Sequence, residues 1–417
     1  MELWDLPSEW EWRQVQEVAE DTERRNPRLD PETTFRYVDI SSVDNEKGAI
    51  KTDEARTIVG REAPSRARKV IKVNDVIFAT TRPYLKNIAL IPADLDDQVC
   101  STGFCVLRAR QGAAEPKYIY YACRSDFFIN QLLPKQRGAN YPAVTDGDVF
   151  DTRLPIPYPE NPARSLAEQR RIVARIETLF EELREMQRLN NAIKEDTGRL
   201  MGAVLGEVFS DLVAKYECVT IKRLKQQEAL SITGGGTPST EKTEYWTGSI
   251  PWASPKDMKT WLIGDTQKHI TQEAIEESSA KRVKAGSILV VVRGMILART
   301  WPVAIARVEL AINQDMKALT PCGELDERFL GYMLRALTPE VLGRVETAAH
   351  GTKRLPSDVL EALEIPLPER TVQKRIAVYL ENVESEIRAM QDIQADDEQA
   401  LQHVEQAILM KAFRGEL

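Results

Sequence analysis

The chain has 417 residues, of which 42% are hydrophobic and 29% are charged, and its formal net charge is −8. This length exceeds one typical domain and the apolar content exceeds that of a disordered chain, so we expect two or three folded units. The negative net charge counts only mildly against nucleic-acid binding, because local clusters of charge decide binding. Apolar runs such as Ile288–Val292 are too short to span a membrane, and five cysteines without a Cys-x-x-Cys pair predict ordinary thiols in a reducing cytoplasm.

Residues 1–162 predict a globular region of mixed α and β structure. Asn74–Ala79 predicts a turn followed by a buried strand, and Tyr118–Asn130 predicts a short helix. Leu154-Pro-Ile-Pro then predicts extended backbone, because proline restricts its own conformation and that of the residue before it. A long amphipathic helix over residues 163–212 follows.

Residues 213–370 repeat this order, and a second long helix over residues 371–417 ends the chain. Gly286–Val292 predicts the turn and strand, Phe329–Leu337 the short helix, and Ile365-Pro-Leu-Pro the extended segment. Equivalent residues are 211 or 212 positions apart in the globular regions, as for Arg82 and Arg293. They are 204 positions apart in the helices, as for Gln169-Arg-Arg-Ile-Val and Gln373-Lys-Arg-Ile-Ala, because the first copy has a longer loop after its Pro-x-Pro segment. We infer a tandem duplication.

Both long helices carry seam residues at alternating steps of four and three, which is a coiled-coil signature. Polar seam residues near the middle, Asn190 and Gln394, predict a fixed register. Gly198, Gly202 and Gly206 predict a kink or a close helix approach. The alternative is that each helix is buried separately on its own globular region. The first seam is Ile172, Ile176, Leu179, Leu183, Met186, Asn190, Ile193, Thr197, Leu200 and Val204, and the second is Ile376, Leu380, Val383, Ile387, Met390, Gln394, Asp397, Leu401, Val404 and Ile408.

The sequence predicts neither a catalytic site nor a metal site. Its three histidines have no metal-ligand spacing, and the Gly-rich loop that begins at Gly234 lacks the Gly-Lys-Ser/Thr ending of a P-loop. Glu115-Pro-Lys117 resembles half of a metal-dependent nuclease site. Asp326-Glu-Arg328 occupies the same position in the second copy, so negative charge at a helix N-terminus explains both better.

Basic side chains mixed with Tyr, Asn, Thr and Gly recur in equivalent loops of both copies. This mixture suits phosphate contacts together with reading of base edges. A single basic residue is more often a solvated surface charge, and the recurrence in both copies favours a binding surface. The candidate DNA-contacting residues are Arg66, Arg68, Arg82, Tyr84, Lys86, Arg137, Asn140, Lys242, Lys256, Lys259, Arg293, Arg299, His350, Thr352 and Lys353.

These motifs together resemble the specificity subunit of Type I restriction-modification systems. The resemblance rests on the stretch 234–258, on Val290–Gly294 and Thr80–Tyr84, on both Pro-x-Pro junctions, and on Lys411–Leu417, and it covers essentially the whole chain. One departure is that the first copy lacks the Gly-Gly-x-Thr-Pro loop and has Val38-Asp-Ile-Ser-Ser-Val instead of an Ile-Pro-Trp…Lys-Asp-Met match.

The resemblance implies an α+β fold with two tandem target-recognition domains, 1–162 and 213–370, each followed by a long helix, the two helices forming an antiparallel coiled coil. It implies recognition of a bipartite DNA site and partnership with two methylation subunits and two restriction/translocase subunits in the cytoplasm. S-adenosylmethionine, ATP and Mg²⁺ are expected only in those partners. Two alternatives remain: a coiled-coil scaffold with protein-binding heads, and a complete modification enzyme, for which the catalytic tetrapeptide is missing.

Overall fold

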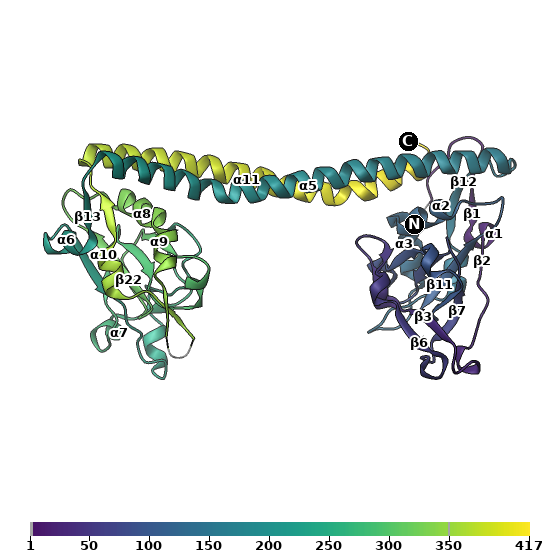
Figure 1. Ribbon diagram of the computed structural model, residues 1–417, viewed down its shortest axis with the longest axis horizontal. Coiled ribbons are helices and arrows are strands. Elements are labelled where there is room, and N and C mark those ends of the chain that lie inside the picture. Colours follow the sequence, from purple (N-terminus) through teal and green to yellow (C-terminus); the bar gives the residue numbers. More distant parts are fainter. Residues whose placement is uncertain (1–2, 349–350) are drawn as a thin grey trace. The chain divides into compact units, whose positions relative to one another are not determined.

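The computed structural model describes residues 3–348 and 351–417, which divide into two compact units (Figure 1). Unit 1 comprises Met1–Asn190 with Asp396–Leu417, and unit 2 comprises Asn191–Ala395. The two long helices, α5 (Pro162–Lys215) and α11 (Arg370–Phe413), contribute residues to both units. No described helix is long and apolar enough to cross a membrane.

Unit 1 contains two four-stranded sheets, ordered β6-β3-β10-β7 and β2-β11-β8-β9, and two two-stranded ladders, β1-β12 and β4-β5. Its strands are β1 (Trp10–Gln14), β2 (Ala19–Glu20), β3 (Thr34–Val38), β4 (Val43–Asp44), β5 (Ala49–Ile50), β6 (Arg56–Val59), β7 (Ala67–Ile71), β8 (Val76–Ala79), β9 (Ile88–Leu90), β10 (Gln98–Ser101), β11 (Phe104–Ala109) and β12 (Arg153–Pro157). Its short helices are α1 (Val15–Val18), α2 (Pro116–Arg124), α3 (Asp126–Leu132) and α4 (Asp146–Phe150).

Unit 2 has the related sheets β14-β22-β19-β20-β16 and β17-β15-β21-β18 and the ladders β13-β25 and β23-β24. It differs from unit 1 in an additional edge strand, β16, which pairs parallel with β20, and in the place of its second ladder along the chain. Its strands are β13 (Cys218–Thr220), β14 (Leu230–Gly234), β15 (Ile250–Ala253), β16 (Leu262–Ile263), β17 (His269–Ile270), β18 (Arg282–Val283), β19 (Ile288–Val291), β20 (Val303–Ala306), β21 (Leu310–Ile312), β22 (Met316–Pro321), β23 (Glu346–Thr347), β24 (Lys353–Arg354) and β25 (Glu364–Pro366). Its short helices are α6 (Ile221–Gln226), α7 (Gln272–Glu276), α8 (Glu327–Ala336), α9 (Thr338–Gly343) and α10 (Ser357–Ala362).

The two units match even where their sequences depart from each other. Among the described residues of unit 1 the only parallel pairing joins β3 to β10, and β15 pairs with β21 in the same parallel manner in unit 2. The segment before Val38 therefore occupies the position of the segment before Lys256, although it has no Gly-rich loop. Each Pro-x-Pro segment is extended as expected, in β12 and β25, and pairs with the first strand of its unit.

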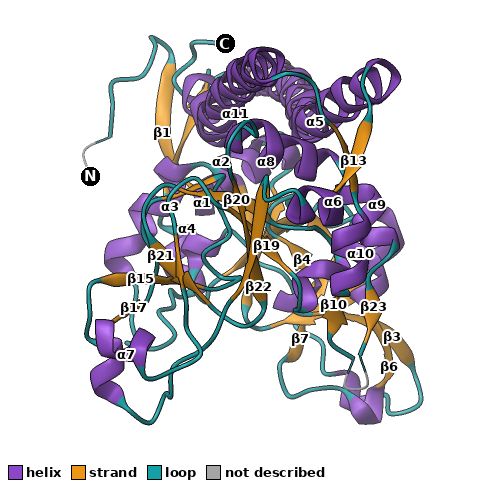
Figure 2. Cartoon of the chain, turned by 90° about the vertical axis from the view of Figure 1, so that its left-hand side faces the viewer, coloured by secondary structure: helices purple, strands orange, loops and turns teal. Residues whose placement is uncertain are grey.

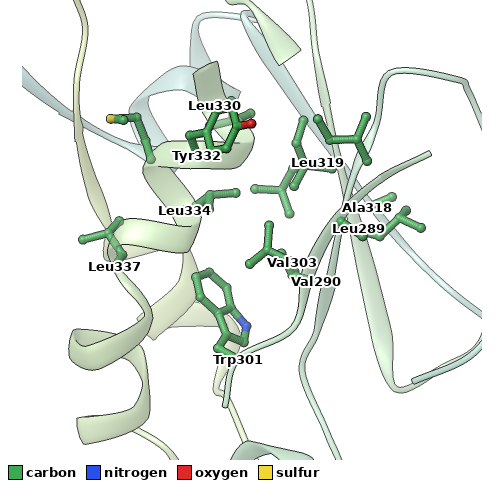
Figure 3. Packing of buried hydrophobic residues seen from close by; sticks show 14 of the residues in the cluster. Leu289, Val290, Trp301, Val303, Ala318, Leu319, Leu330, Tyr332, Leu334 and Leu337 are labelled. Atoms are coloured by element: carbon green, nitrogen blue, oxygen red, sulfur yellow. The ribbon is translucent and has the colours of Figure 1, made fainter. Parts of the chain in front are cut away.

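The core of each unit lies between the sheet and a short helix that faces the long helices. In unit 2, α8 packs Phe329, Leu330 and Tyr332 against β19, β20 and β22, and Trp301 closes the lower end of the same cluster (Figure 3). Figure 2 shows α8 between the strands and the long helices. The predicted strands β8 and β19 are fully buried. The predicted helix at 118–130 is in fact two helices, because Ser125 ends α2 and caps α3.

The long helices run antiparallel within each unit, which confirms the predicted arrangement. In unit 1, Ile172 and Ile176 near the start of α5 share a core cluster with Leu409 and Phe413 at the end of α11. In unit 2, the last part of α5 lies against the first part of α11, where Val208–Tyr216 and Val372–Tyr379 line one cleft. Since each globular region packs on both helices, the alternative of separately buried helices is wrong.

Two expectations about the seam need correction. Met186, Ile193, Leu200 and Met390 are between 39% and 55% exposed, so a period of 3.5 does not bury every seam position here. A Cβ atom added at Gly198, Gly202 or Gly206 would meet nothing within 4 Å, so these glycines do not mark a close helix approach. Of the two polar seam residues, Gln394 is buried and donates from Nε2 to Thr197 Oγ1, a second seam position, at 2.9 Å.

A buried glutamine joins each long helix to its globular region, which explains the repeated Gln-Arg/Lys-Arg-Ile motif. Gln169 Oε1 accepts a hydrogen bond from Glu115 N (2.9 Å), and Gln373 Oε1 accepts one from Asp326 N (2.9 Å). Both side chains are at most 2% exposed, and both amide nitrogens donate to nearby carbonyl oxygens. The start of α2 or α8 is thereby held against the long helix.

Replacing Gln373 by leucine should lower the free energy of unfolding by about 1–3 kcal/mol, because the buried Asp326 N–H loses its only acceptor among the described residues. Urea unfolding of the purified chain measures this difference. The matched control is Gln391→Leu, an exposed glutamine on the same helix, whose effect should stay within about 0.5 kcal/mol. Equal effects of the two variants would contradict the role of Gln373.

Candidate nucleic-acid interface

In unit 1, the loop after β8 is joined to the loop before α4 by backbone hydrogen bonds. Val144 N donates to Thr80 O (2.9 Å), and Arg82 N donates to Pro142 O (2.7 Å). Arg82 has a φ of 50°, in the left-handed region that only glycine adopts without strain. The junction therefore fixes Arg82 in an uncommon backbone conformation at the end of a buried strand.

The Arg82 guanidinium orders the tip of the second loop. Its Nη2 donates to Asn140 O at 3.1 Å, and its Cζ lies 4.8 Å from the centroid of the Tyr141 ring. Tyr141 is 70% exposed. The fold thus brings together Arg82 and Asn140, which the sequence singled out in separate loops, and adds Tyr141, which sequence reasoning missed although it directly follows Asn140.

Two other cations of this loop pair, Arg137 and Lys86, have carboxylate partners. Arg137 Nη1 lies 2.9 Å from Asp148 Oδ2, and Lys86 Nζ lies 2.7 Å from Asp126 Oδ1. Hydrogen bonds from Thr145 N and from its hydroxyl, with that from Arg137, lower the pKa of Asp148 to about 2. Asp148 is therefore ionised at neutral pH, and a phosphate would have to compete with it for Arg137.

The sequence also predicts a basic run before β8, made of Arg61, Arg66, Arg68, Lys69 and Lys72, and this run does not form one surface. Arg66 is exposed and lies at the same end of the sheet as Arg82. Arg68 is half-buried and its Nη1 donates to Ala67 O at 2.7 Å. Lys69 is 1% exposed and pairs with Asp146 on α4, so the expectation that it joins the surface run is wrong. Lys69 is buried because it lies on β7 next to the core, and its partner Asp146 is 77 residues away in the sequence.

Unit 2 has the same junction in the same place. Gly294 N donates to Lys353 O, Leu355 N donates to Val292 O, both at 2.9 Å, and Arg293 forms an isolated bridge with Arg354. The sequence-predicted residues Arg293, Thr352 and Lys353 are therefore brought together. The shared hydrogen bonds align Gly294 with Arg82 and Arg293 with Thr81, so the sequence-based pairing of Arg82 with Arg293 is off by one residue. Thr352 stands where unit 1 has Tyr141. His350 lies outside the described residues.

The Gly-rich loop of unit 2 serves close packing. A Cβ atom at Gly235 would lie 1.9 Å from Asn313 O, and one at Gly236 would lie 2.4 Å from Ser279. Asn313 N in turn donates to Ala253 O at 2.9 Å, at the end of β15. The turn that carries exposed Lys256 thus lies beside the loop that precedes β22, whose Asp315 O accepts from Arg293 N at 3.2 Å.

Three further candidate DNA-contacting residues of unit 2 take no part in the hydrogen bonds of this junction. Lys242 pairs with Glu277 at 3.1 Å and lies over the Tyr245 ring. Lys259 lines a cleft of about 810 Å³ between the globular region and the long helices, together with Trp261. Arg299 is exposed at the end of the turn that follows Arg293.

The residues that resembled half of a nuclease site have structural partners. Glu115 forms an ion pair with Arg170 (2.6 Å), and Lys117 forms one with Glu177 (2.6 Å) on α5. Arg328 and Glu381 repeat the second pair at 2.8 Å. Asp326 caps α8 as expected, whereas Glu115 makes no side-chain cap, so its role is this ion pair.

Acidic groups and thiols form no candidate metal centre in residues 3–348 and 351–417. No group of three His, Cys, Asp or Glu side chains in that part of the chain could hold a metal ion. Burial raises the pKa of the Cys100, Cys105 and Cys123 thiols and keeps them protonated.

Comparison with solved structures gives close matches over the whole chain. The HsdS subunit from Thermoanaerobacter tengcongensis is 39% identical, with a TM-score of 0.71 and 99% of both chains covered. A chain from a structure described as the basis of complex assembly and conformational transition of the type I R-M system is 38% identical, with a TM-score of 0.77 and full coverage of both chains.

The family described as Type I restriction modification DNA specificity domain matches residues 7–195 and again residues 219–396. The chain belongs to this family. It carries two specificity domains, and the expectation drawn from the sequence motifs is confirmed. The junctions at Arg82 and at Arg293 each lie within one specificity domain.

Among named relatives, the Escherichia coli EcoR124I/EcoR124II specificity subunit is 29% identical over 270 residues, which cover 64% of this chain and 63% of that protein. The Methanocaldococcus jannaschii MjaIX specificity subunit is 31% identical over 163 residues, covering 38% of this chain and 36% of that protein. The chain thus matches less than two thirds of the length of these two relatives.

Proposed function

We propose that this specificity subunit recognises a bipartite DNA site, with one half-site read by each specificity domain. The observation that carries the proposal is the repeated loop junction. Each junction has the same backbone hydrogen bonds, while the side chains differ: Asn140 and Tyr141 in unit 1 correspond to Gly351 and Thr352 in unit 2. A common frame with different side chains suits the reading of two different base sequences.

The chain supplies recognition in this proposal, and the chemistry belongs to partner subunits. Two methylation subunits would methylate adenine with S-adenosylmethionine, and two restriction/translocase subunits would use ATP and Mg²⁺. The names of the relatives, which are specificity subunits of restriction enzymes, support this division. So do the ion pairs that occupy Glu115 and Lys117, the one pair of residues that resembled a catalytic motif.

An exchange of one specificity domain tests the proposal. Replacing residues 1–157 by the equivalent segment of a relative with a different site should change one half of the methylated sequence and leave the other half unchanged. Sequencing of methylated bases in a host that carries the parent or the hybrid measures this. The reciprocal hybrid, exchanged over residues 216–366, should change the other half only. A hybrid that altered both halves would count against one half-site per domain.

A protein-binding scaffold is the competing hypothesis, and salt dependence separates the two. DNA binding by the full complex should weaken steeply as salt rises, because phosphate contacts release counterions. A complex that bound cognate and scrambled duplexes equally would remove the support for sequence-specific recognition.

A further inference from the structure

Each loop junction carries a short 3-10 turn whose tip exposes two large apolar side chains. In unit 1 the turn Pro83–Leu85 exposes Tyr84 (46%) and Leu85 (40%). In unit 2 the turn Met295–Ala298 exposes Met295 (62%) and Ile296 (37%). Both pairs follow the junction arginine, Arg82 or Arg293, within three residues. Among these four side chains, only Tyr84 was a candidate from the sequence.

The exposed pair in unit 1 is held firmly. Pro83 is buried beneath the turn, Leu85 N donates to Arg82 O (2.9 Å), and Asn45 Nδ2 donates to Leu85 O (3.0 Å). Arg82 and Lys86, on either side of the turn, both have positive φ angles, of 50° and 52°. Such strained conformations persist only where the surrounding structure imposes them, and they concentrate at functional sites.

The exposed pair in unit 2 has an equivalent support. Leu297 is 2% exposed and anchors the turn from below, and its N–H donates to Gly294 O at 3.2 Å. Gly294 has a φ of 137°, so the residue that starts this turn is also outside the usual region. Met295 and Ile296 therefore face outward from a fixed turn.

The exposed apolar residues differ between the two turns, and this difference points to DNA as the partner that contacts them. A partner subunit present in two equivalent copies would require the same residues at its contact site in each unit. The helices show such repetition, in the ion pairs Lys117–Glu177 and Arg328–Glu381. The tips instead carry Tyr-Leu in one unit and Met-Ile in the other. Different apolar shapes, beside an arginine that lies one residue earlier in the backbone frame of unit 2 than in that of unit 1, fit two different half-sites.

We propose that these apolar pairs contact the 5-methyl groups of thymines in the major groove, one pair in each half-site. The junction arginine is suited to a neighbouring guanine, since Arg pairs with the guanine edge and apolar side chains contact the thymine methyl. This inference rests on the proposed function. Because each half-site would hold a methylatable adenine, its A·T pair guarantees at least one thymine per half-site.

Replacing thymine by deoxyuridine removes only the methyl group, and so provides the test. Binding by the full complex is measured on the DNA site that methylome sequencing identifies, with each thymine replaced by deoxyuridine in turn. We expect at least one replacement in each half-site to weaken parent binding about fourfold, which corresponds to about 0.8 kcal/mol for one buried methyl group. The double variant Tyr84→Ala/Leu85→Ala should bind the thymine and uracil forms of its own half-site equally.

The same variant should keep the parent's sensitivity to uracil in the other half-site, and Met295→Ala/Ile296→Ala should show the reverse pattern. Leu29→Ala, at a 77% exposed apolar residue of unit 1, is the matched surface control and should behave as the parent. A parent insensitive to uracil everywhere, or variants that keep its full sensitivity, would overturn the inference. Variants that fail to assemble with partner subunits would also overturn it in favour of a protein contact. A parent without sequence preference would instead defeat the proposed function itself.

Discussion

Replacing Phe413 by alanine should lower the free energy of unfolding by about 3–5 kcal/mol, the usual cost of removing a large buried aromatic side chain. The Phe413 side chain is fully buried, and its ring centroid lies 5.0 Å from that of Tyr118 and 5.3 Å from that of Phe127. It joins the end of α11 to α2 and α3, which lie in the first third of the sequence. Chemical denaturation of the purified variant measures the loss.

The matched control for Phe413 is Tyr379→Ala. Tyr379 is an aromatic residue on the same helix and is 52% exposed, so its replacement should cost far less. If the two variants unfolded at the same denaturant concentration, α11 would not depend on the aromatic cluster of unit 1.

Alanine at Arg82 or Arg293 should weaken binding of the cognate duplex by the full complex by about 1–3 kcal/mol, roughly five- to 150-fold. Each change should relax specificity at one position of the matching half-site, because each arginine lies at the junction of one specificity domain. Titration with cognate duplexes altered at single positions measures both effects. An equal loss for cognate and scrambled duplexes would assign these arginines to phosphate contacts.

Lys256→Ala provides the comparison. As an exposed lysine in a turn, it is expected to contact phosphate, so its loss should weaken all sequences alike and lower the salt slope by about one unit. Arg137 and Lys86 already have carboxylate partners, and their replacement should therefore have smaller effects than that of Arg82.

Local features of the sequence were enough to predict that the same order of strand, helix, extended segment and long helix occurs twice. Strand and helix patterns, the Pro-x-Pro segments and the recurring glutamine each depend on neighbouring residues, and so they are visible in one chain read against itself. The loops around Arg82 and Arg293 could be predicted as equivalent for the same reason. Membership of the family followed from motifs at fixed spacing, and the comparisons confirm it.

Contacts between distant residues could be decided only by the tertiary structure. Lys69 looked like part of a basic surface, but its side chain is 1% exposed and pairs with Asp146 at the start of α4. The sequence excluded a P-loop at the Gly-rich loop but gave no reason for its glycines, and the close approach of Asn313 O explains Gly235. A 3.5-residue period identifies one face of a helix, but it does not say how much of that face a partner covers, which is why Met186 and Met390 are exposed. Periodicity reports a single element, whereas burial depends on what the rest of the chain places against it.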